Sequence, residues 1–394
     1  MRQIYLAATG QNRGKTTVAL GLLAALIDRG LETGFIKPVG QRYGFVDGAP
    51  IDEDAILMRS VFGLPDPPAA LSPVHIPRGF TKAFISGKVV EDLPTRIVAA
   101  HERVSRGREV VLIEGTGHAG VGAVIGLSNA DVAAMLGARA LIVSEAGVGR
   151  PIDEIVLNRA LFARHGVEVV GAVVNKVDHE AHPTLAGVLE RGLARHGIEL
   201  LGVLPYRPLL SNPTLEMLIE QLPGELLSEG PDLGRVIEHV AIGAMQPGHV
   251  LQRIGPGSLL IVPGDREDVV EAAVAATLAA RVGVPPGTVD ATGEGEPRFG
   301  RRGSDEAATD PAGIVLTGGY RPGPAALEGI RRARLFAYLV AQDTYAAASE
   351  VHDLLVKTHP DDAEKIALTK ALVAEHLEVE RILDRFAAPA PAHD

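Results

Sequence analysis

Residues 8–26, ATGQNRGKTTVALGLLAAL, follow the apolar run RQIYLA and decide the fold of the first half of the chain. A strand-like run, a loop with glycines and an Ala/Leu-rich helical pattern succeed one another. Glycines let the backbone N–H groups of such a loop turn inward, and the N-terminus of the following helix adds partial positive charge. The stretch therefore predicts a phosphate-binding loop. A glycine turn that merely caps a core helix is the alternative, and the strand–loop–helix context disfavours it.

The residues of this loop have distinct predicted roles. Lys15 would reach the β and γ phosphates of a nucleotide, and the Thr16 hydroxyl would take a place on Mg²⁺. The spacing departs from the usual G-x-x-x-x-G-K-[ST], because Thr9 stands at the first glycine position and Gly10 comes one residue later. The loop residues predicted to bind nucleotide are Gly10, Gln11, Asn12, Arg13, Gly14, Lys15, Thr16 and Thr17.

Short β-branched runs alternate with helical patterns through the first half, which predicts an α/β fold. The runs are residues 2–9, 34–40, 108–116, 139–146, 167–177 and 199–205. Strands that are apolar throughout and separated by helices form a parallel sheet covered by helices on both faces. Ligands of such sheets bind at the carboxyl ends of the strands.

Polar side chains stand where they could meet at that edge. Glu114 ends an apolar strand, and Asp54 lies in IDEDAILM; each carboxylate could hold Mg²⁺, although Asp54 could equally be an acid at a helix N-terminus. The run NKVD, residues 175–178, follows another strand at the level of a nucleotide base. Asn175 can bind a purine edge and Asp178 could accept from guanine, so these residues leave the base open.

Bulk properties exclude several classes of function. The 394 residues suffice for two or three domains, and 38 Lys and Arg against 49 Asp and Glu give a net charge of −11. That charge disfavours nucleic acid and anionic membrane surfaces as partners. The chain has no cysteine, which excludes thiolate metal sites and a cysteine nucleophile. No apolar run is long enough to span a bilayer, so a cytoplasmic location is expected.

The pattern changes near Asn212, where we place a domain boundary. Strand–turn–helix series at residues 258–282, 313–323 and 335–356 predict a second, smaller α/β domain, with a mobile loop at about 286–312. Apolar residues at helical spacing between 361 and 386 predict a C-terminal helix that packs by one face, before a disordered tail. The predicted domains are residues 1–212, 213–357 and 358–394.

With these motifs in place, the first half resembles dethiobiotin synthetase and the related cobyrinic acid amide synthases, which are P-loop enzymes. The matching motifs are TGQNRGKTT, KPV with Lys37, DA at Asp54, EG at Glu114, NKVD, and GVLP ending at Pro205. The resemblance implies that Lys15, Thr16, Asp54 and Glu114 bind Mg²⁺ and ATP. It places Lys37 at the γ-phosphate and an acid substrate. It also implies that Asn175, with Lys176, Asp178 and Pro205 nearby, binds adenine, and that the protein is a homo-oligomer.

The whole chain resembles more closely the N-terminal region of long bacterial phosphate acetyltransferases, which ends in a DRTGG domain. The residues that give that domain its name are Asp265, Arg266, Thr317, Gly318 and Gly319. Asp265 and Arg266 could clamp a ligand or form an ion pair that braces a turn, and the Thr-Gly-Gly run could be a ligand site or a tight turn. The acetyltransferase catalytic domain has no counterpart here, so acetyl transfer is not expected.

Two functions follow from this resemblance. The first is an ATP-dependent ligase-type enzyme or ATPase, in which Lys15 and Lys37 are catalytic and the γ-phosphoryl group passes to a carboxylate or carbamate. The segments KPVGQR and GTGHAGVGAVIGL differ from the synthetases, which leaves the acceptor open. The second is a non-catalytic nucleotide-sensing module that acts on a metabolic partner enzyme such as a phosphate acetyltransferase.

Overall fold

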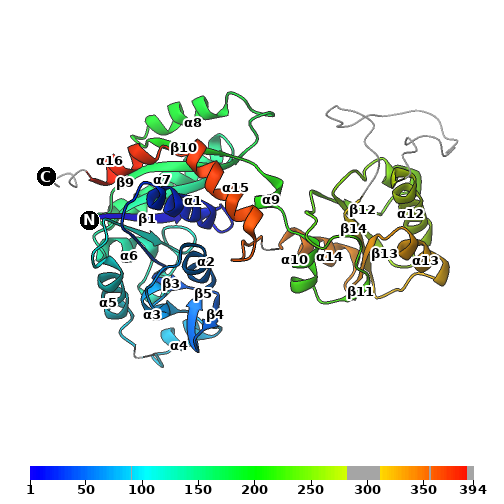
Figure 1. The fold of residues 1–394 in the computed structure, drawn as a ribbon, viewed down its shortest axis with the longest axis horizontal. Helices are drawn as coiled ribbons and strands as arrows, with labels where there is room; N and C mark the ends of the chain where they lie inside the picture. The colour runs from blue at the N-terminus through cyan, green and yellow to red at the C-terminus, as the bar shows by residue number, and fades with distance from the viewer. Residues whose placement is uncertain (90, 282–310, 355, 388–394) are drawn as a thin grey trace. The chain divides into compact units, whose positions relative to one another are not determined.

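The computed structural model describes residues 1–89, 91–281, 311–354 and 356–387, which form two compact units (Figure 1). The first unit contains Met1–Leu210 and continues from Lys357 onward, and the second contains Ser211–Val356. The predicted mobile loop, apart from Pro311 and Ala312, and the predicted tail beyond residue 387 lie outside the described residues.

The first unit is built on a sheet of six parallel strands, as the sequence predicts. In spatial order these are β10 (Leu200–Pro205), β9 (Val169–Val177), β8 (Arg139–Glu145), β1 (Arg2–Ala8), β7 (Val110–Glu114) and β2 (Thr33–Ile36). All neighbouring pairs are parallel. The carboxyl ends of these strands therefore meet at one edge, which is where the motif residues stand.

Helices cover this sheet on both faces. From β1 the chain runs towards β2 through α1 (Lys15–Asp28), and it later runs the opposite way through α5 (Leu93–Ser105), α6 (Asn129–Met135), α7 (Gly149–Arg164) and α8 (Leu185–Ala194). Because crossovers between parallel strands are right-handed, the two directions place their helices on opposite faces.

Small elements between β2 and α5 position the predicted acidic residues. The strands β3 (Val39–Gly40) and β6 (Val74–His75) pair, β4 (Tyr43–Val46) and β5 (Ala49–Asp52) form a hairpin, and α2 (Glu53–Phe62), α3 (Pro68–Leu71) and α4 (Phe80–Ile85) follow. Asp52 caps α2 by accepting from the Asp54 backbone N–H at 3.0 Å. Asp54 thus lies in the first turn of a helix.

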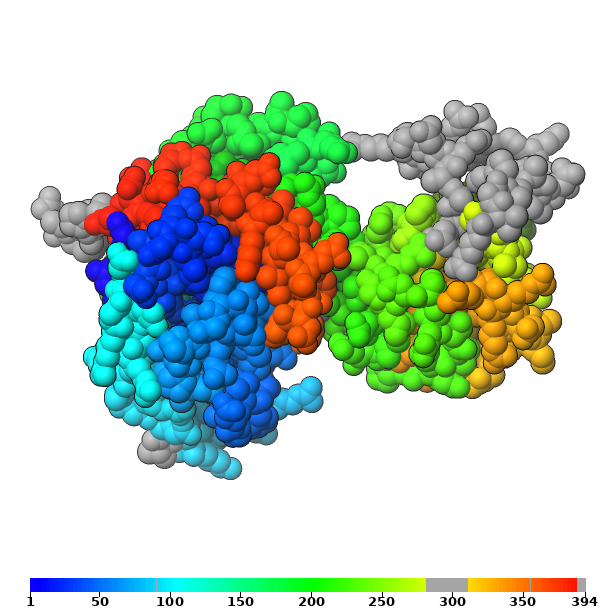
Figure 2. Space-filling view, viewed as in Figure 1, coloured from blue at the N-terminus to red at the C-terminus, as the bar shows by residue number. Residues whose placement is uncertain are grey.

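The predicted C-terminal helix is present, but it is divided in two. The helices α15 (Ala363–His376) and α16 (Val379–Ala387) are separated at Leu377, which is extended and bridges to Gly202 at the edge of the sheet. Both helices contact α1 and β10 (Figure 1). In the space-filling view the orange and red C-terminal residues lie against α1, in dark blue (Figure 2).

The second unit is a five-stranded sheet with helices on both faces. Its order is β11 (Glu225–Ser228), β15 (Phe336–Leu339), β14 (Gly313–Thr317), β13 (Ser258–Pro263) and β12 (His239–Ile242), with only β11 antiparallel. Apolar side chains from α10 (Leu215–Gln221) and α14 (Thr344–His352) fill one face, and those from α11 (Pro247–Leu251), α12 (Glu267–Arg281) and α13 (Pro324–Arg332) fill the other. The short helix α9 (Pro208–Ser211) leads into this unit. Within the described parts of both units, no helix has the length and apolarity to cross a membrane.

Candidate functional site

The predicted phosphate loop joins β1 to α1 in the expected geometry. Asn12 and Gly14 have positive φ angles of 58° and 83°, and Gly14 is the N-cap of α1. No side chain caps this helix, so its first N–H groups remain available to an anion. Gln11 and Asn12 are exposed, whereas Lys15 is buried.

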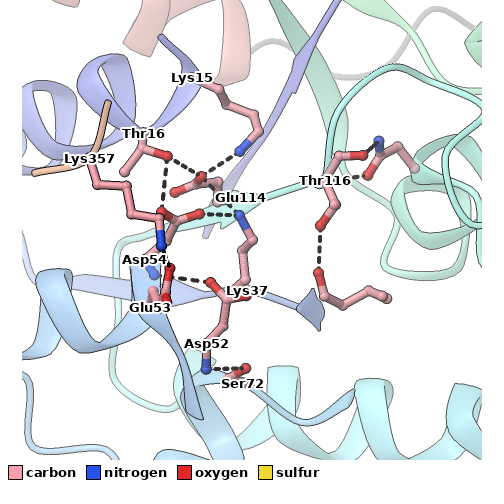
Figure 3. Close-up of polar contacts among 12 residues, drawn as sticks. Lys15, Thr16, Lys37, Asp52, Glu53, Asp54, Ser72, Glu114, Thr116 and Lys357 are labelled. Atoms are coloured by element: carbon pink, nitrogen blue, oxygen red, sulfur yellow. Dashed lines mark hydrogen bonds and ion pairs between the residues drawn. The ribbon is translucent and has the colours of Figure 1, made fainter. Parts of the chain in front are cut away.

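Two lysines and two carboxylates form a charged array beside the loop (Figure 3). Glu114 has no exposed surface, and its Oε1 accepts from Lys15 and, at 3.1 Å, from Lys37. Lys37, only 4% exposed, also donates to Asp54. The array therefore brings together residues from α1, β7, α2 and the segment after β2.

The three predicted metal ligands also meet. The Thr16 hydroxyl lies 3.2 Å from Asp54 Oδ1 and 3.0 Å from Glu114 Oε1. Glu114 Oε2 is buried without a hydrogen-bond partner among the described residues. A buried carboxylate oxygen without a partner beside a second carboxylate and a hydroxyl suits a hard cation such as Mg²⁺. No group of three His, Cys, Asp or Glu side chains that could hold a metal occurs in the described residues. Thr16, Asp54 and Glu114 offer fewer than the six oxygen ligands that Mg²⁺ takes, so a metal here would also be bound by oxygen atoms of its ligand or of water.

The pKa values in the array follow from burial and close pairing. Burial lowers the pKa of Lys15, against the opposing effect of Glu114. Burial alone would also lower the pKa of Lys37, but Asp54 and Glu114 outweigh it and hold that pKa well above its usual range. Burial acts to raise the pKa of Asp54, but Lys37 and Lys15 reverse this and lower it. Asp54 and Glu114 thus favour the charged form of Lys37 in a buried site.

A contact that the sequence analysis missed lies directly beside the array. Lys357, where the chain returns to the first unit, pairs with Glu53 in the first turn of α2. Glu53 directly precedes Asp54 in the sequence. The ion pair of Lys357 therefore lies next to a predicted metal ligand (Figure 3). The two residues are 304 positions apart. No local pattern links residues at such a distance.

The first two residues of the NKVD run lie against the phosphate loop. Asn175 Nδ2 donates to the Arg13 carbonyl at 3.2 Å, and Lys176 Nζ donates to the Asn12 carbonyl at 2.9 Å. Asp178 is exposed, and its Oδ1 accepts from Ala181 N–H. Pro205 is buried at the end of β10 beside Val177. The structure thus brings Asn175 and Lys176 to the predicted phosphate-binding residues, whereas the contacts of Asp178 and Pro205 given above are with Ala181 and Val177.

The loop after β7 is held by side chains that sequence reasoning did not identify. Asn129 Oδ1 accepts from Tyr5 Oη at 2.8 Å and from Thr116 N–H at 2.9 Å, and its Nδ2 donates to the carbonyls of Thr116 and His118. Asn158 Oδ1 accepts from Ala119 N–H. These bonds fix the EGTGH loop beside Glu114. An Asn at the start of a helix gives no sequence signal for this role.

In the second unit, the predicted ligand residues meet at the carboxyl ends of β13 and β14. Pro263 and Thr317 are register partners, so Asp265 and Arg266 follow one strand where Gly318 and Gly319 follow the other. Arg266 pairs with Asp268, at 2.9 Å and 3.0 Å, rather than with the exposed Asp265.

The Thr-Gly-Gly run forms a tight turn. The Thr317 hydroxyl bonds to that of Thr344 at 2.8 Å, and Gly318 and Gly319 have positive φ angles of 80° and 70°. Such a turn favours glycine at both positions. Binding of a ligand by this group of residues stays a prediction.

The chain is similar to phosphate acetyltransferases over nearly its whole length. It is 26% identical to that of Pseudomonas aeruginosa over 409 residues and 25% identical to that of Nitrosomonas europaea over 402 residues. Each alignment covers 99% of this chain but 53% and 52% of the relative. The chain therefore spans about half the length of the curated relatives it matches.

Solved structures match parts of the chain at low similarity. MinD of Aquifex aeolicus covers 53% of this chain and 84% of its own, with 17% identity and a TM-score of 0.34. The CBS and DRTGG domains of Clostridium perfringens pyrophosphatase, complexed with diadenosine tetraphosphate, cover 41% of this chain and 60% of their own. Their identity is 16% and the TM-score is 0.26.

Two family models match successive parts of the chain. The model described as DRTGG domain matches residues 217–354, and the model described as AAA domain matches residues 2–214. The protein therefore belongs to the AAA domain family, as a P-loop domain followed by a DRTGG domain and related to phosphate acetyltransferases.

Proposed function

We propose that the first unit binds a nucleoside triphosphate with Mg²⁺ and transfers its γ-phosphoryl group to a carboxylate, a carbamate or water. The observation that carries this proposal is the buried array of Lys15, Lys37, Asp54 and Glu114 beside the uncapped N-terminus of α1. Phosphoryl transfer needs positive charge and precise positioning more than covalent chemistry, and this array supplies both.

The charges of the array explain how it would receive a triphosphate. Two ammonium groups face two carboxylates, so the array is close to neutral by itself. A triphosphate on the loop competes with Glu114 for Lys15 and frees that carboxylate. Thr16, Asp54 and Glu114 would hold Mg²⁺, which neutralises charge on the phosphate oxygens when bound. Lys37 stays charged and stabilises the transferring group.

The candidate site for the acceptor consists of two segments next to the array. The EGTGH loop and the segment after Lys37 contact each other next to the array, since Thr116 Oγ1 donates to the Val39 carbonyl. These are the segments in which the sequence departs from the synthetases. The resemblance favours a carboxylate or carbamate as the acceptor and ATP as the donor. The array itself would contact the phosphates and the metal. The acceptor must therefore be found by experiment.

The test is a phosphorus NMR time course of nucleoside triphosphate with Mg²⁺ and a panel of amines, carboxylic acids and bicarbonate. We expect Lys15→Ala to abolish binding and turnover. We expect Lys37→Ala to abolish turnover and to weaken binding by about tenfold, the lower end of what one hydrogen bond to a charged group contributes. Lys82→Ala, which removes an exposed lysine of α4, is the control. Full turnover in the Lys37 variant would contradict the proposal.

A second candidate function is nucleotide sensing for a partner enzyme. It is favoured by the segment through which the chain re-enters the first unit. In that segment Lys357 pairs with Glu53, the neighbour of Asp54, and α15 packs on α1. A ligand of the second unit could thereby act on the nucleotide site. This function predicts nucleotide binding that depends on Lys15 without consumption in the NMR experiment, and binding to a phosphate acetyltransferase is then the next measurement.

A further inference from the structure

The helix α2, which carries Asp54, is attached at both ends to residues 357–387, the C-terminal segment of the first unit. At the first residue of α2, Glu53 pairs with Lys357 (Figure 3). At its last residue, the Phe62 ring centroid lies 5.0 Å from Lys370 Nζ in α15, a cation–π distance. Three of the ten residues of α2 are buried, which are Ala55, Leu57 and Met58. The contacts at the two ends therefore add to a short apolar face.

A buried lysine fixes the position of Lys357. Lys365 in α15 is buried, and its Nζ donates to the Lys357 carbonyl at 3.4 Å and to Asp362 Oδ2 at 3.3 Å. The same Asp362 oxygen accepts from the His359 N–H at 2.8 Å. A buried ammonium needs such partners, because an unpaired charge in the interior is costly. The residues before α15 are thus held by hydrogen bonds, so the side chain of Lys357 extends from a defined point of the backbone.

The C-terminal segment also packs on α1, which carries Thr16. The closest approach of α15 to α1 is where Val373 meets Gly21. Thr16 and Asp54 are both predicted metal ligands, and Thr16 Oγ1 lies 3.2 Å from Asp54 Oδ1. The C-terminal segment therefore contacts both of the helices that carry these two ligands. Because Mg²⁺ demands near-ideal octahedral geometry, the spacing of its ligands decides how well it binds.

We propose that Lys357 and Lys370 are positioning residues, which hold α2 to the C-terminal segment so that Asp54 stays at the metal site. This inference rests on the proposed function, because it requires Mg²⁺ and a triphosphate at the phosphate loop. It goes beyond that function, because the metal site then depends on the segment through which the chain re-enters the first unit. Both lysines act through α2 and not by contact with a reacting group.

Charge and position make opposite predictions for Lys357. Its removal leaves Glu53 without this ammonium next to Asp54, so a cation is attracted more strongly. By charge alone, Lys357→Met would tighten the binding of Mg²⁺. Loss of the ion pair also releases the first turn of α2, and this effect weakens the binding of Mg²⁺. The direction of the change therefore distinguishes the two roles.

The test compares the Kd of β,γ-imido-ATP, a non-hydrolysable analogue, in Mg²⁺ and in EDTA by titration calorimetry on the full chain. The ratio of the two Kd values is the gain in affinity from the metal. We expect Lys357→Met to reduce this gain about threefold to fivefold, the upper part of what an exposed ion pair contributes. Lys357→Met combined with Lys370→Met should reduce it by about tenfold, since a cation–π contact is then lost as well. The Kd in EDTA should stay the same in both variants.

Further variants separate pairing from charge and from folding. Lys357→Arg keeps the charge and the partner, and it should retain the gain of the wild type. Glu53→Lys combined with Lys357→Glu reverses the pair at unchanged net charge, and it should restore most of the gain that either change alone removes. Lys82→Met removes an exposed lysine of α4 and should have no effect. Thermal melts in EDTA check that each variant is folded, and the reversed pair provides the same test if Lys357→Met is not.

The outcomes separate this inference from the proposed function. Binding that depends on Lys15, with an unchanged or larger gain from Mg²⁺ in Lys357→Met, overturns the positioning role and leaves the triphosphate site in place. A reversed pair that binds Mg²⁺ no better than Lys357→Glu alone also overturns that role. Wild-type binding that does not depend on Lys15, or that gains nothing from Mg²⁺, overturns both proposals.

Discussion

At the scale of one residue, Glu114 shows that this site depends on the pairing of buried charges. It is fully buried, yet two ammonium groups share one of its oxygens while the other oxygen has no partner within the described region. A buried carboxylate in this position is stabilised by the lysines and not by solvent. The same arrangement leaves one oxygen ready for a cation. Stability and metal binding are therefore linked in this array.

Lys37→Met tests that link. The variant leaves Asp54 and Glu114 with one buried ammonium in place of two. We expect it to lose about 3–5 kcal/mol of unfolding free energy, the usual cost of breaking a buried ion pair. Mg²⁺ should raise the melting temperature of the variant more than that of the wild type, because a divalent cation replaces the lost charge. Denaturant unfolding and thermal melts with and without Mg²⁺ measure both effects.

The matched control is Lys82→Met, which removes an exposed lysine and should change neither stability nor the response to Mg²⁺. A Lys37→Met protein as stable as the wild type in the absence of Mg²⁺ would show that the carboxylates do not need this lysine.

The sequence predicted the residues of the array, but not the residues around it. Lys15, Thr16 and Glu114 were predictable because each stands at a strand end or loop with a known pattern. Asn129 and Lys357 were not, because each acts on a partner far along the chain: Tyr5 is 124 positions from Asn129 and Glu53 is 304 from Lys357. Only the folded structure brings such pairs together.

At the scale of elements, the contact between α1 and α15 is very close. A Cβ atom at Gly21 would lie 2.3 Å from Val373 Cγ2 and 2.4 Å from Val373 Cβ. Such distances require one of the two helices to shift. Glycine in α1 is therefore required by the neighbouring helix, although it lowers the intrinsic helix propensity.

The same substitution at two helical glycines should thus have opposite effects. Gly21→Ala should destabilise the protein by about 1–3 kcal/mol, the usual cost of overpacking, despite the better propensity of alanine. Gly187→Ala in α8 should stabilise it by up to about 1 kcal/mol, because the nearest neighbour of its new Cβ atom is Arg191 Nη1 at 3.4 Å. Urea unfolding of both variants measures the difference. A stabilising Gly21→Ala would mean that α15 is not held against α1.

The strands were more predictable than the end of the chain. Each strand of the first sheet is an apolar run bounded by turns, so its local sequence pattern is enough to predict it. The break between α15 and α16 at Leu377 has a tertiary cause, which is the bridge of Leu377 to Gly202. No Gly or Pro near this position predicts the break from the sequence. The helical spacing predicted one packed face from Leu368, Leu372, Val379, Ile382 and Phe386, and of these five only Leu368 is not buried. Leu368 is only half-buried, whereas Val373 and Leu383 are buried.

At the scale of the whole molecule, the second unit interrupts the first. The sequence pattern predicts residues 358–394 as a separate segment, whereas the described part of that segment completes the core of the first unit. The side chains that it adds to the core around β1 are Ile366, Val373, Leu377, Val379, Ile382, Leu383 and Phe386. Each buried side chain of this kind contributes about 1.5–3 kcal/mol. Their sum is comparable with the total stability of an ordinary domain, about 5–15 kcal/mol.

This connectivity makes a prediction about fragments. Residues 1–210 alone should not unfold cooperatively, because the face of α1 that contacts α15 is uncovered. Residues 1–210 joined to 357–387 by a Gly/Ser linker should fold and bind triphosphate as the full chain does. Residues 211–356 should fold alone, since their sheet has a core on both faces. Thermal melts and nucleotide titrations of the three proteins measure this, with Val373→Asp in the joined protein as the control that should undo folding. Equal melting temperatures for residues 1–210 with and without the C-terminal helices would contradict the prediction, since the helices would then contribute nothing to the core.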